Sequence, residues 1–340
     1  MTDLAAAGQT EQDTATGESA GLELELERYR KELTGYCYRM LGSTFEAEDA
    51  VQETMVRAWR SFDRFEGRSS VRSWLYRIAT NVCLDMLGGS QRRARPMDLA
   101  DPKTADGPLG EAMPEATWIQ PMPDSNILPE GAGGDPAELA VERETIRLAF
   151  VAALQHLPPR QRAVLILREV LRWKATEVAE LLDTSVVSVN STLQRARATI
   201  AQSDLASSDP IQPEDDDQRE LLARYVDAFE RYDMESLTAI LHEDATLSMP
   251  PYALWMRGHD NIRGWFLGTG IGCRGSRLIQ TTANGSPAFG QYRPSQSGQG
   301  HDPWALQVIE VSGNKVVGLN AFLDTASLFP LFGLPSHLGP

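Results

Sequence analysis

Two hydrophobic periods run through this chain, and the change from one to the other limits the folds open to it. Between residues 22 and 200, apolar side chains recur every three or four positions, as in amphipathic helices. Later, helical stretches near 219–232 and 258–267 are followed by alternating apolar and polar positions, the pattern of strands. The 340 residues therefore predict a multidomain protein, with two all-α domains ahead of an α+β domain.

The first helical domain is expected over residues 22–90. One helix covers 22–41, and Ser43 followed by Glu46 has the spacing of a capping box that starts a second helix. A third helix follows the polar connection FDRFEGRSS, and Ser69 or Ser70 can cap it. Its Trp74 lies on the apolar side of the helix, so we assign this side chain to the core.

Composition divides the rest of the chain. Residues 1–21 have the polar composition of a disordered acidic tail, and 91–135 and 203–217 have that of acidic linkers. A second helical domain is expected over 136–202, where Asp-Pro gives a good helix start, and the α+β domain over 218–332.

The net charge of −15 is unevenly distributed. Residues 28–97 carry a net +5 and 141–200 a net +3, whereas 98–140 carry −8. Salt screens each patch beyond about 10 Å, so local charge decides whether phosphates are attracted. Two basic blocks set between acidic segments are thus compatible with DNA binding.

The pattern of apolar and turn residues over 162–200 is typical of a helix-turn-helix. A short helix buries Val178 and Leu181, a turn surrounds Asp183, and a second helix buries Val189 and Leu193. Such a motif places its second helix in the major groove of duplex DNA. The alternative is a helical hairpin whose polar faces are merely solvated.

The α+β domain has two strong hairpin turns, Asn284-Gly285 and Gly313-Asn314. Apolar residues alternate on both sides of the second turn, so two paired strands are expected there.

The second and third helices, from TFEAEDAVQETMVRAW to VRSWLYRIATNVCLDML, resemble region 2 of the sigma-70 family of RNA polymerase factors. The helix-turn-helix that ends in LQRAR resembles region 4. The order and lengths of the two regions resemble the extracytoplasmic-function (ECF) group. The last domain, with RGHDNIRGWF, resembles SnoaL-like members of the NTF2 fold, and such a fusion is most similar to the actinobacterial sigma factor G type.

The resemblance implies a transcription initiation factor that is not an enzyme. Its partners would be core RNA polymerase, through the beta-prime clamp and the beta flap, and promoter DNA. The core-polymerase-binding residues would be Asp49, Gln52 and Glu53, which independently lie opposite the buried stripe of their helix.

Capture of unpaired bases needs aromatic platforms among cations, since stacking contributes about 1 to 3 kcal/mol per base. The residues with this character, assigned to binding and melting of the −10 element, are Phe62, Arg64, Phe65, Arg68, Arg72, Tyr76, Arg77 and Asn81. Those assigned to the −35 element are Lys174, Ser188, Asn190, Ser191, Gln194, Arg195 and Arg197.

Two positions depart from the family pattern. Asp183 stands where a turn glycine is common, and Asp tolerates a left-handed backbone moderately well. Asn190 replaces a residue that is often basic, which weakens the expected promoter contact.

The aromatic content of the last domain is enough to line a cavity, with Tyr225, Phe229, Trp255, Trp265, Trp304 and Phe322 as the expected pocket. We expect this domain to dock on the helical pair and regulate its access to polymerase, with a small molecule as a candidate ligand. Residues 98–135 of the acidic linker are expected to lie in the polymerase channel that later carries RNA, where their carboxylates would imitate its phosphates.

Two other functions remain open. The first is a stand-alone helix-turn-helix regulator, which would bind DNA without polymerase. This function would not explain the DAVQE segment at residues 49–53 or the aromatic and arginine side chains that follow it. An enzyme of polyketide-cyclase type would use His242, His259 or Asp260, but no acid–base pair can be fixed from the sequence.

The rest of the sequence adds few constraints. Cys37, Cys83 and Cys273 form neither a CxxC pair nor a zinc pattern, so buried thiols are expected, with no metal and no cofactor. The chain shows neither a signal peptide nor a membrane span, so a cytoplasmic location is expected. The promoter, the inducing signal and any anti-sigma factor are not identified.

Overall fold

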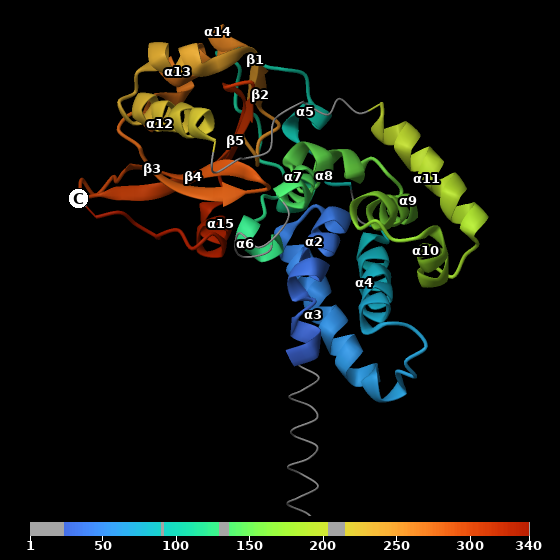
Figure 1. The fold of residues 1–340 in the computed structure, drawn as a ribbon. Helices are drawn as coiled ribbons and strands as arrows, with labels where there is room; N and C mark the ends of the chain where they lie inside the picture. Colours follow the sequence, from blue (N-terminus) through green and yellow to red (C-terminus); the bar gives the residue numbers. More distant parts are fainter. Residues whose placement is uncertain (1–23, 90–91, 129–135, 203–214, 340) are drawn as a thin grey trace, which may run out of the picture. The chain divides into compact units, whose positions relative to one another are not determined.

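The computed structural model describes residues 24–89, 92–128, 136–202 and 215–339 (Figure 1). The chain divides into two compact units. The helical unit consists of residues up to 90 and 158–198, and the mixed unit of 91–157 and 199 onward. The expected acidic tail and the cap residue Asp135 lie outside the described residues.

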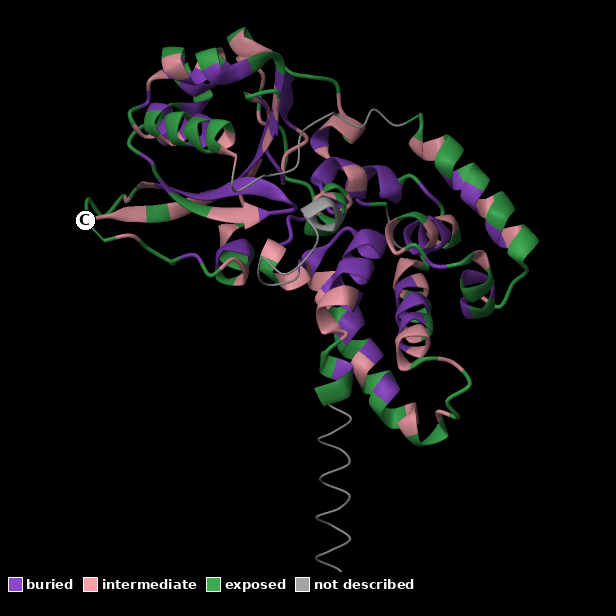
Figure 2. Cartoon of the chain, in the orientation of Figure 1, coloured by how far each residue is buried: buried purple, intermediate pink, exposed green. Residues whose placement is uncertain are grey.

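Three helices form the first half of the helical unit: α2 (Arg30–Leu41), α3 (Thr44–Ser61) and α4 (Val71–Leu87). The expected caps are confirmed, because the Ser43 hydroxyl accepts a hydrogen bond from the Glu46 amide and Ser70 accepts one from Ser73. Cys37 and Cys83 are buried where these helices meet, as predicted. Burial follows the expected stripe in α3, whereas α2 is buried on all sides from Leu33 to Leu41 instead of on one face (Figure 2).

The second half contains α9 (Pro159–Leu165), a π-helical turn (Ile166–Val170), α10 (Ala175–Leu181) and α11 (Val186–Ile200). The buried guanidinium of Arg162 at the start of α9 donates to the backbone carbonyl of Met40 at the end of α2. The rings of Tyr76 and Trp173 lie 5.0 Å apart, so α4 packs on the segment ahead of α10. The two halves therefore share one core.

The mixed unit is built on a six-stranded sheet with the order β2-β1-β6-β5-β4-β3. The strands are β1 (Leu241–Ser248), β2 (Trp255–Arg257), β3 (Arg277–Ala283), β4 (Ser286–Pro294), β5 (His301–Ser312) and β6 (Lys315–Phe322). All neighbours pair antiparallel except β1 and β6, which are parallel. Both predicted hairpins are confirmed, and Asn284 and Gly285 both have positive φ, as this type of turn requires.

Helices cover both faces of this sheet. On one face α12 (Asp216–Glu230), α13 (Met234–Ile240) and α14 (His259–Leu267) enclose a core that includes Phe289, Ile309 and Leu319. On the other face, Phe329 of α15 (Thr325–Leu331) packs edge-on against Tyr292. Of these helices, α12 and α14 match the predicted segments, whereas α13 and α15 were not predicted.

The linker is not an open connection, because residues 92–128 pack on the sheet domain within the mixed unit. They contain α5 (Pro96–Leu99), a 3₁₀ turn (Glu115–Thr117) and α6 (Asp124–Ile127), and α7 (Pro136–Glu144) and α8 (Leu148–Gln155) follow. The indole N–H of Trp255 donates to the Ala100 carbonyl at 2.6 Å, and the Met113 amide donates to the Pro251 carbonyl at 2.9 Å.

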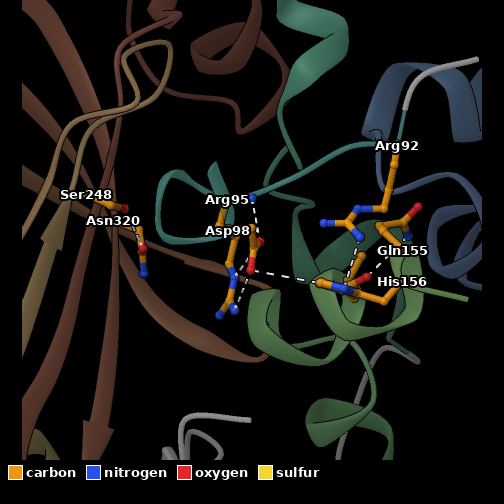
Figure 3. Close-up of polar contacts among 8 residues, drawn as sticks. Arg92, Arg95, Asp98, Gln155, His156, Ser248 and Asn320 are labelled. Carbon is orange, nitrogen blue, oxygen red and sulfur yellow. Dashed lines mark hydrogen bonds and ion pairs between the residues drawn. The ribbon is translucent and has the colours of Figure 1, made fainter. Parts of the chain in front are cut away.

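A polar network ties α5 to the end of α8 (Figure 3). The Asp98 carboxylate accepts from the Arg95 amide at 2.8 Å and lies 3.9 Å from the His156 ring, whose other nitrogen is 3.0 Å from Arg92. Burial and Arg92 together lower the pKa of His156. The imidazole is therefore held neutral near pH 7, and its contact with Asp98 is not a strong ion pair.

A buried attachment of the linker is made by Asn284, which is fully buried in the first hairpin turn. Its side-chain oxygen accepts from the Met122 amide at 2.9 Å, and its side-chain nitrogen donates to the Ile146 carbonyl at 2.6 Å. The Asp124 carboxylate accepts from the Gly285 amide at 2.8 Å. One turn thus holds the linker and the segment ahead of α8.

We predict that Asn284→Gly will loosen this attachment while preserving the turn, because glycine accepts positive φ. Two buried hydrogen bonds are lost, so the free energy of unfolding should fall by about 2 to 4 kcal/mol. Amide exchange should rise at Met122 and stay unchanged at Val189 of α11, which belongs to the helical unit. Unchanged protection of Met122 would contradict this role for Asn284.

A second prediction concerns pH. Burial raises the pKa of Asp124 to about 6, so the folded state binds a proton that an unfolded chain releases near pH 4. Stability should therefore decrease as pH rises from about 4 to about 6, and the penalty should persist above that range. Melting temperatures of the wild type and Asp124→Asn across this range will test it. The difference between them should change with pH, and parallel curves would contradict the assignment.

Candidate nucleic-acid interface

The outer face of α11 has the exposure of a groove-reading helix. Asn190, Ser191, Gln194, Arg195 and Arg197 are exposed, and Ser188 is half-buried. Val189 and Leu193 are buried on the opposite face, as predicted. Lys174 is exposed at the start of α10. The seven residues assigned to the −35 element therefore lie on one motif, and their DNA contacts stay a prediction.

The turn between α10 and α11 keeps the expected geometry without glycine. Asp183 adopts a φ of 50°, and the next amide, that of Thr184, donates to the Ala179 carbonyl at 2.9 Å. The Ser185 hydroxyl accepts from the Ser188 amide and caps α11. Asp at position 183 thus supports the left-handed turn, as the sequence suggested.

Sequence reasoning missed an apolar residue on the recognition helix. Val187 is 78% exposed at the N-terminal end of α11, the end that meets base edges in such motifs. An exposed aliphatic side chain there suits contact with a thymine methyl group. The signal was present in the sequence, because Val187 falls off the buried stripe of Val189 and Leu193.

Arg197 is not freely available in this structure. Its guanidinium forms an ion pair with Glu169 at 2.6 Å. Both groups are exposed, so the pair contributes little to stability and can exchange for a phosphate.

An aromatic and cationic cavity forms between the two halves of the helical unit. It has a volume of about 440 Å³, and its lining includes Arg64, Phe65, Arg68, Trp74 and Arg77. Phe62 stacks on Phe65 with ring centroids 6.1 Å apart, and Trp74 lies 4.8 Å from Phe65. This combination of ring faces and guanidinium groups can hold an unstacked base and its phosphate.

Trp74 corrects the assignment made from the helical period. It is only partly buried, and it contributes a wall of this cavity instead of belonging wholly to the core. The helical stripe identified its direction correctly, but the side chain lies at the end of the bundle, where no further layer covers it.

Tyr76 and Arg72 were assigned to DNA but are engaged inside the unit. The Tyr76 hydroxyl and the Arg72 Nε both donate to the Glu32 carboxylate, at 2.9 Å and 2.7 Å. Arg72 also lies over the rings of Tyr76 and Trp173. Tyr76 is fully buried, whereas Asn81 is exposed and lines a separate groove with Arg77.

The face of α3 assigned to polymerase is exposed at all three positions, Asp49, Gln52 and Glu53. Glu53 pairs with Arg57 at 2.6 Å. The same face continues into Val56 and Trp59, and Trp59 is 54% exposed. Trp59 lines a groove of about 510 Å³ whose wall includes Leu26 and Met55. An exposed tryptophan beside charged groups is typical of a protein–protein contact centre, which the sequence reasoning did not find.

The six aromatic residues expected to form one pocket in the last domain do not do so. Tyr225, Trp265 and Trp304 line the interior of the cone, where the remaining space is only about 20 Å³. Phe229 is packed in the core, Trp255 is hydrogen-bonded to the linker, and Phe322 lines a different cavity. The prediction of a single pocket was wrong because the large rings fill the cone instead of surrounding a space.

The polar side chains of the cone interior hydrogen-bond to one another. Tyr225, Gln307 and Gln291 form a buried hydrogen-bond chain, and Ser248 donates to Asn320 at 2.8 Å (Figure 3). Among the described residues that line this space, none is Asp, Glu or His. His242 and Asp260 are exposed, and the His259 ring bonds to the backbone of β1.

Comparison with known proteins decides the family. The sigma-70 region 2 model matches residues 26–93, the sigma-70 region 4 model matches 147–200, and a SnoaL-like domain model matches 222–319. The ECF RNA polymerase sigma factor SigG of Mycobacterium tuberculosis is 45% identical, and the alignment covers 92% of this chain and 83% of that one. The chain belongs to the ECF sigma factors.

Two further comparisons agree. SigJ of Mycobacterium tuberculosis is 30% identical over 72% of each chain. Its crystal structure covers 92% of this chain and 99% of its own, with a TM-score of 0.58 and 24% identity, which supports the shared fold. The predicted fold class, helical regions followed by an NTF2-like domain, is thereby confirmed. No helix in the described part of the sigma factor is long and apolar enough to cross a membrane.

We predict that Trp59→Ala will weaken binding to core polymerase by about tenfold or more, since exposed tryptophans at contact centres often contribute above 2 kcal/mol. The melting temperature should change little, because the ring is half exposed. Leu267→Ala, an equally exposed apolar position on α14, is the matched control. Equal losses in both variants, measured by fluorescence anisotropy with labelled core, would contradict a specific role for Trp59.

Proposed function

We propose that this ECF sigma factor divides promoter recognition between two surfaces of its helical unit and regulates both through its linker and SnoaL-like domain. The observation that carries the proposal is the cavity of Arg64, Phe65, Arg68 and Trp74 in the same unit as the exposed face of α11. One surface is built to trap an unpaired base and the other to read duplex DNA. The protein would act in the cytoplasm, where polymerase and chromosome are found.

Docking to core polymerase is assigned to the α3 face. Polar and charged groups on this face come from Asp49, Gln52 and Glu53. Val56 and Trp59 add exposed apolar side chains beside them. This arrangement, an apolar anchor beside polar groups, follows the usual anatomy of a protein interface. The clamp of the beta-prime subunit is the expected partner of this face, and the beta flap that of region 4.

The linker supports a regulatory role for the last domain. Its acidic segment was expected to enter the RNA channel of polymerase, yet residues 92–128 are hydrogen-bonded to the SnoaL-like domain. One segment cannot satisfy both partners at once, so domain and polymerase compete for it. Weakening of the Asn284 attachment should favour the polymerase-bound state.

A non-enzymatic role fits the cone interior best. Its described lining has no carboxylate or imidazole, and its free volume is too small for a substrate of polyketide size. We therefore place the domain in regulation and not in turnover.

Run-off transcription tests the proposal. Purified core polymerase with genomic fragments from the host should start at discrete sites only when this protein is added. Asn284→Gly should raise transcript yield, because it frees the linker. The double variant Arg195→Ala/Arg197→Ala should still bind core and lose start-site selection, since phosphate and base contacts are removed. Core binding without any discrete start site in the wild type would overturn the function.

A further inference from the structure

The mixed unit contains a cavity of about 420 Å³ outside the cone. One wall is linker, residues 113 and 115 together with 118–121. The other wall is the SnoaL-like domain, residues 250–252 with 322–324 and Leu328. Its volume lies in the range of small-molecule sites, and the cone interior, at about 20 Å³, offers no comparable space.

The walls are held in place by the backbone. The Met113 amide donates to the Pro251 carbonyl at 2.9 Å, and Ala112 forms a bridge with Tyr252. At the other end, the Leu323 amide donates to the Pro250 carbonyl at 3.0 Å. The linker therefore closes over the site, and an occupant would contact linker and domain together.

The cavity lining is mainly apolar and aromatic, and its charged side chains are acidic. Trp118, Tyr252 and Phe322 supply rings, and their aliphatic neighbours include Ile119 and Leu328. The carboxylates in the lining belong to Glu115 and Asp324, and none of the described residues that line the cavity is Lys, Arg or His. Arg93 pairs with Glu115 at 3.2 Å, whereas Asp324 is exposed at the start of α15 and caps that helix. Rings beside carboxylates favour a cation over an anion.

The buried indole of Trp118 forms part of the linker wall of this cavity. The side chain is 3% exposed, and its N–H has no hydrogen-bond partner within the described ranges. A buried donor without a partner costs about 1 to 3 kcal/mol, so such groups are uncommon in a surface that serves only packing.

We propose that this cavity binds a small, flat, aromatic molecule that carries a positive charge, and that binding fixes the linker on the SnoaL-like domain. The inference deepens the proposed regulatory function and rests on it only for its effect on transcription. The occupant inserts its rings between Trp118 and the domain wall and places its cation towards Asp324. The linker then dissociates more slowly from this surface of the SnoaL-like domain.

Two fluorescent probes of opposite charge test the site on the full-length protein. The cationic alkaloid berberine should bind saturably with one equivalent, and the anion 1-anilinonaphthalene-8-sulfonate should bind at least tenfold more weakly. Met113→Trp places a large ring in the cavity wall at a partly exposed position, and it should abolish berberine binding. Equal binding of both probes, or berberine binding unaffected by Met113→Trp, would overturn the proposal.

Two Asp→Asn variants test whether the carboxylate of Asp324 contributes to binding. Asp324→Asn keeps the helix cap and should weaken berberine binding about two- to fivefold, the effect of one partly exposed charge. Asp260→Asn, on an exposed position of α14 outside the cavity, should leave binding unchanged. Identical losses in the two variants would show a general charge effect and contradict the site.

Hydrogen exchange tests the coupling to the linker. Bound berberine should slow exchange of the Met113 and Trp118 amides and leave Val189 in α11 unchanged. Saturable binding without this protection would overturn the coupling. Run-off transcription without probe stands apart from these measurements, so a failure there would remove the sigma function and leave the cavity results standing.

Discussion

A single buried amide, that of Asn284, connects three segments that lie far apart in the sequence. It closes the hairpin between β3 and β4, holds Met122 of the linker and holds Ile146 ahead of α8. Because an unpaired buried amide would be costly, the linker is bound here by satisfied polar groups and not by apolar contact alone. The linker wall of the cavity ends at Pro121, directly before the residue that this amide holds.

Much of the architecture was predictable because local chemistry determines it. Ser43 and Ser70 cap their helices, Asp183 makes the turn of the helix-turn-helix, and Asn284-Gly285 makes a hairpin, all as the sequence predicted. Each is a short-range signal in which one side chain favours one backbone conformation. The helical stripes of α3 and α11 were predictable for the same reason.

What escaped prediction depends on contacts distant in sequence. Composition marked residues 92–128 as a linker, but nothing local indicated that they would cover a sheet domain. Trp74 was expected in the core and Tyr76 on the DNA-binding surface, but the structure shows the reverse. Trp74 is partly exposed, whereas Tyr76 is enclosed by Glu32 and Trp173. The aromatic residues of the cone were counted correctly, but whether rings line a space or fill it depends on their packing.

The base-sized cavity in the helical unit has a wall that belongs to the other half of that unit. Glu180 of α10 lines it, and the Glu180 carbonyl accepts a hydrogen bond from Arg77. Arg77 of α4 is therefore held by the backbone of the protein's own helix-turn-helix. Any movement of α10 away from α4 would break this hydrogen bond and remove one wall of the cavity. The shape of the cavity and the arrangement of the two halves are therefore linked, because neither can change without the other.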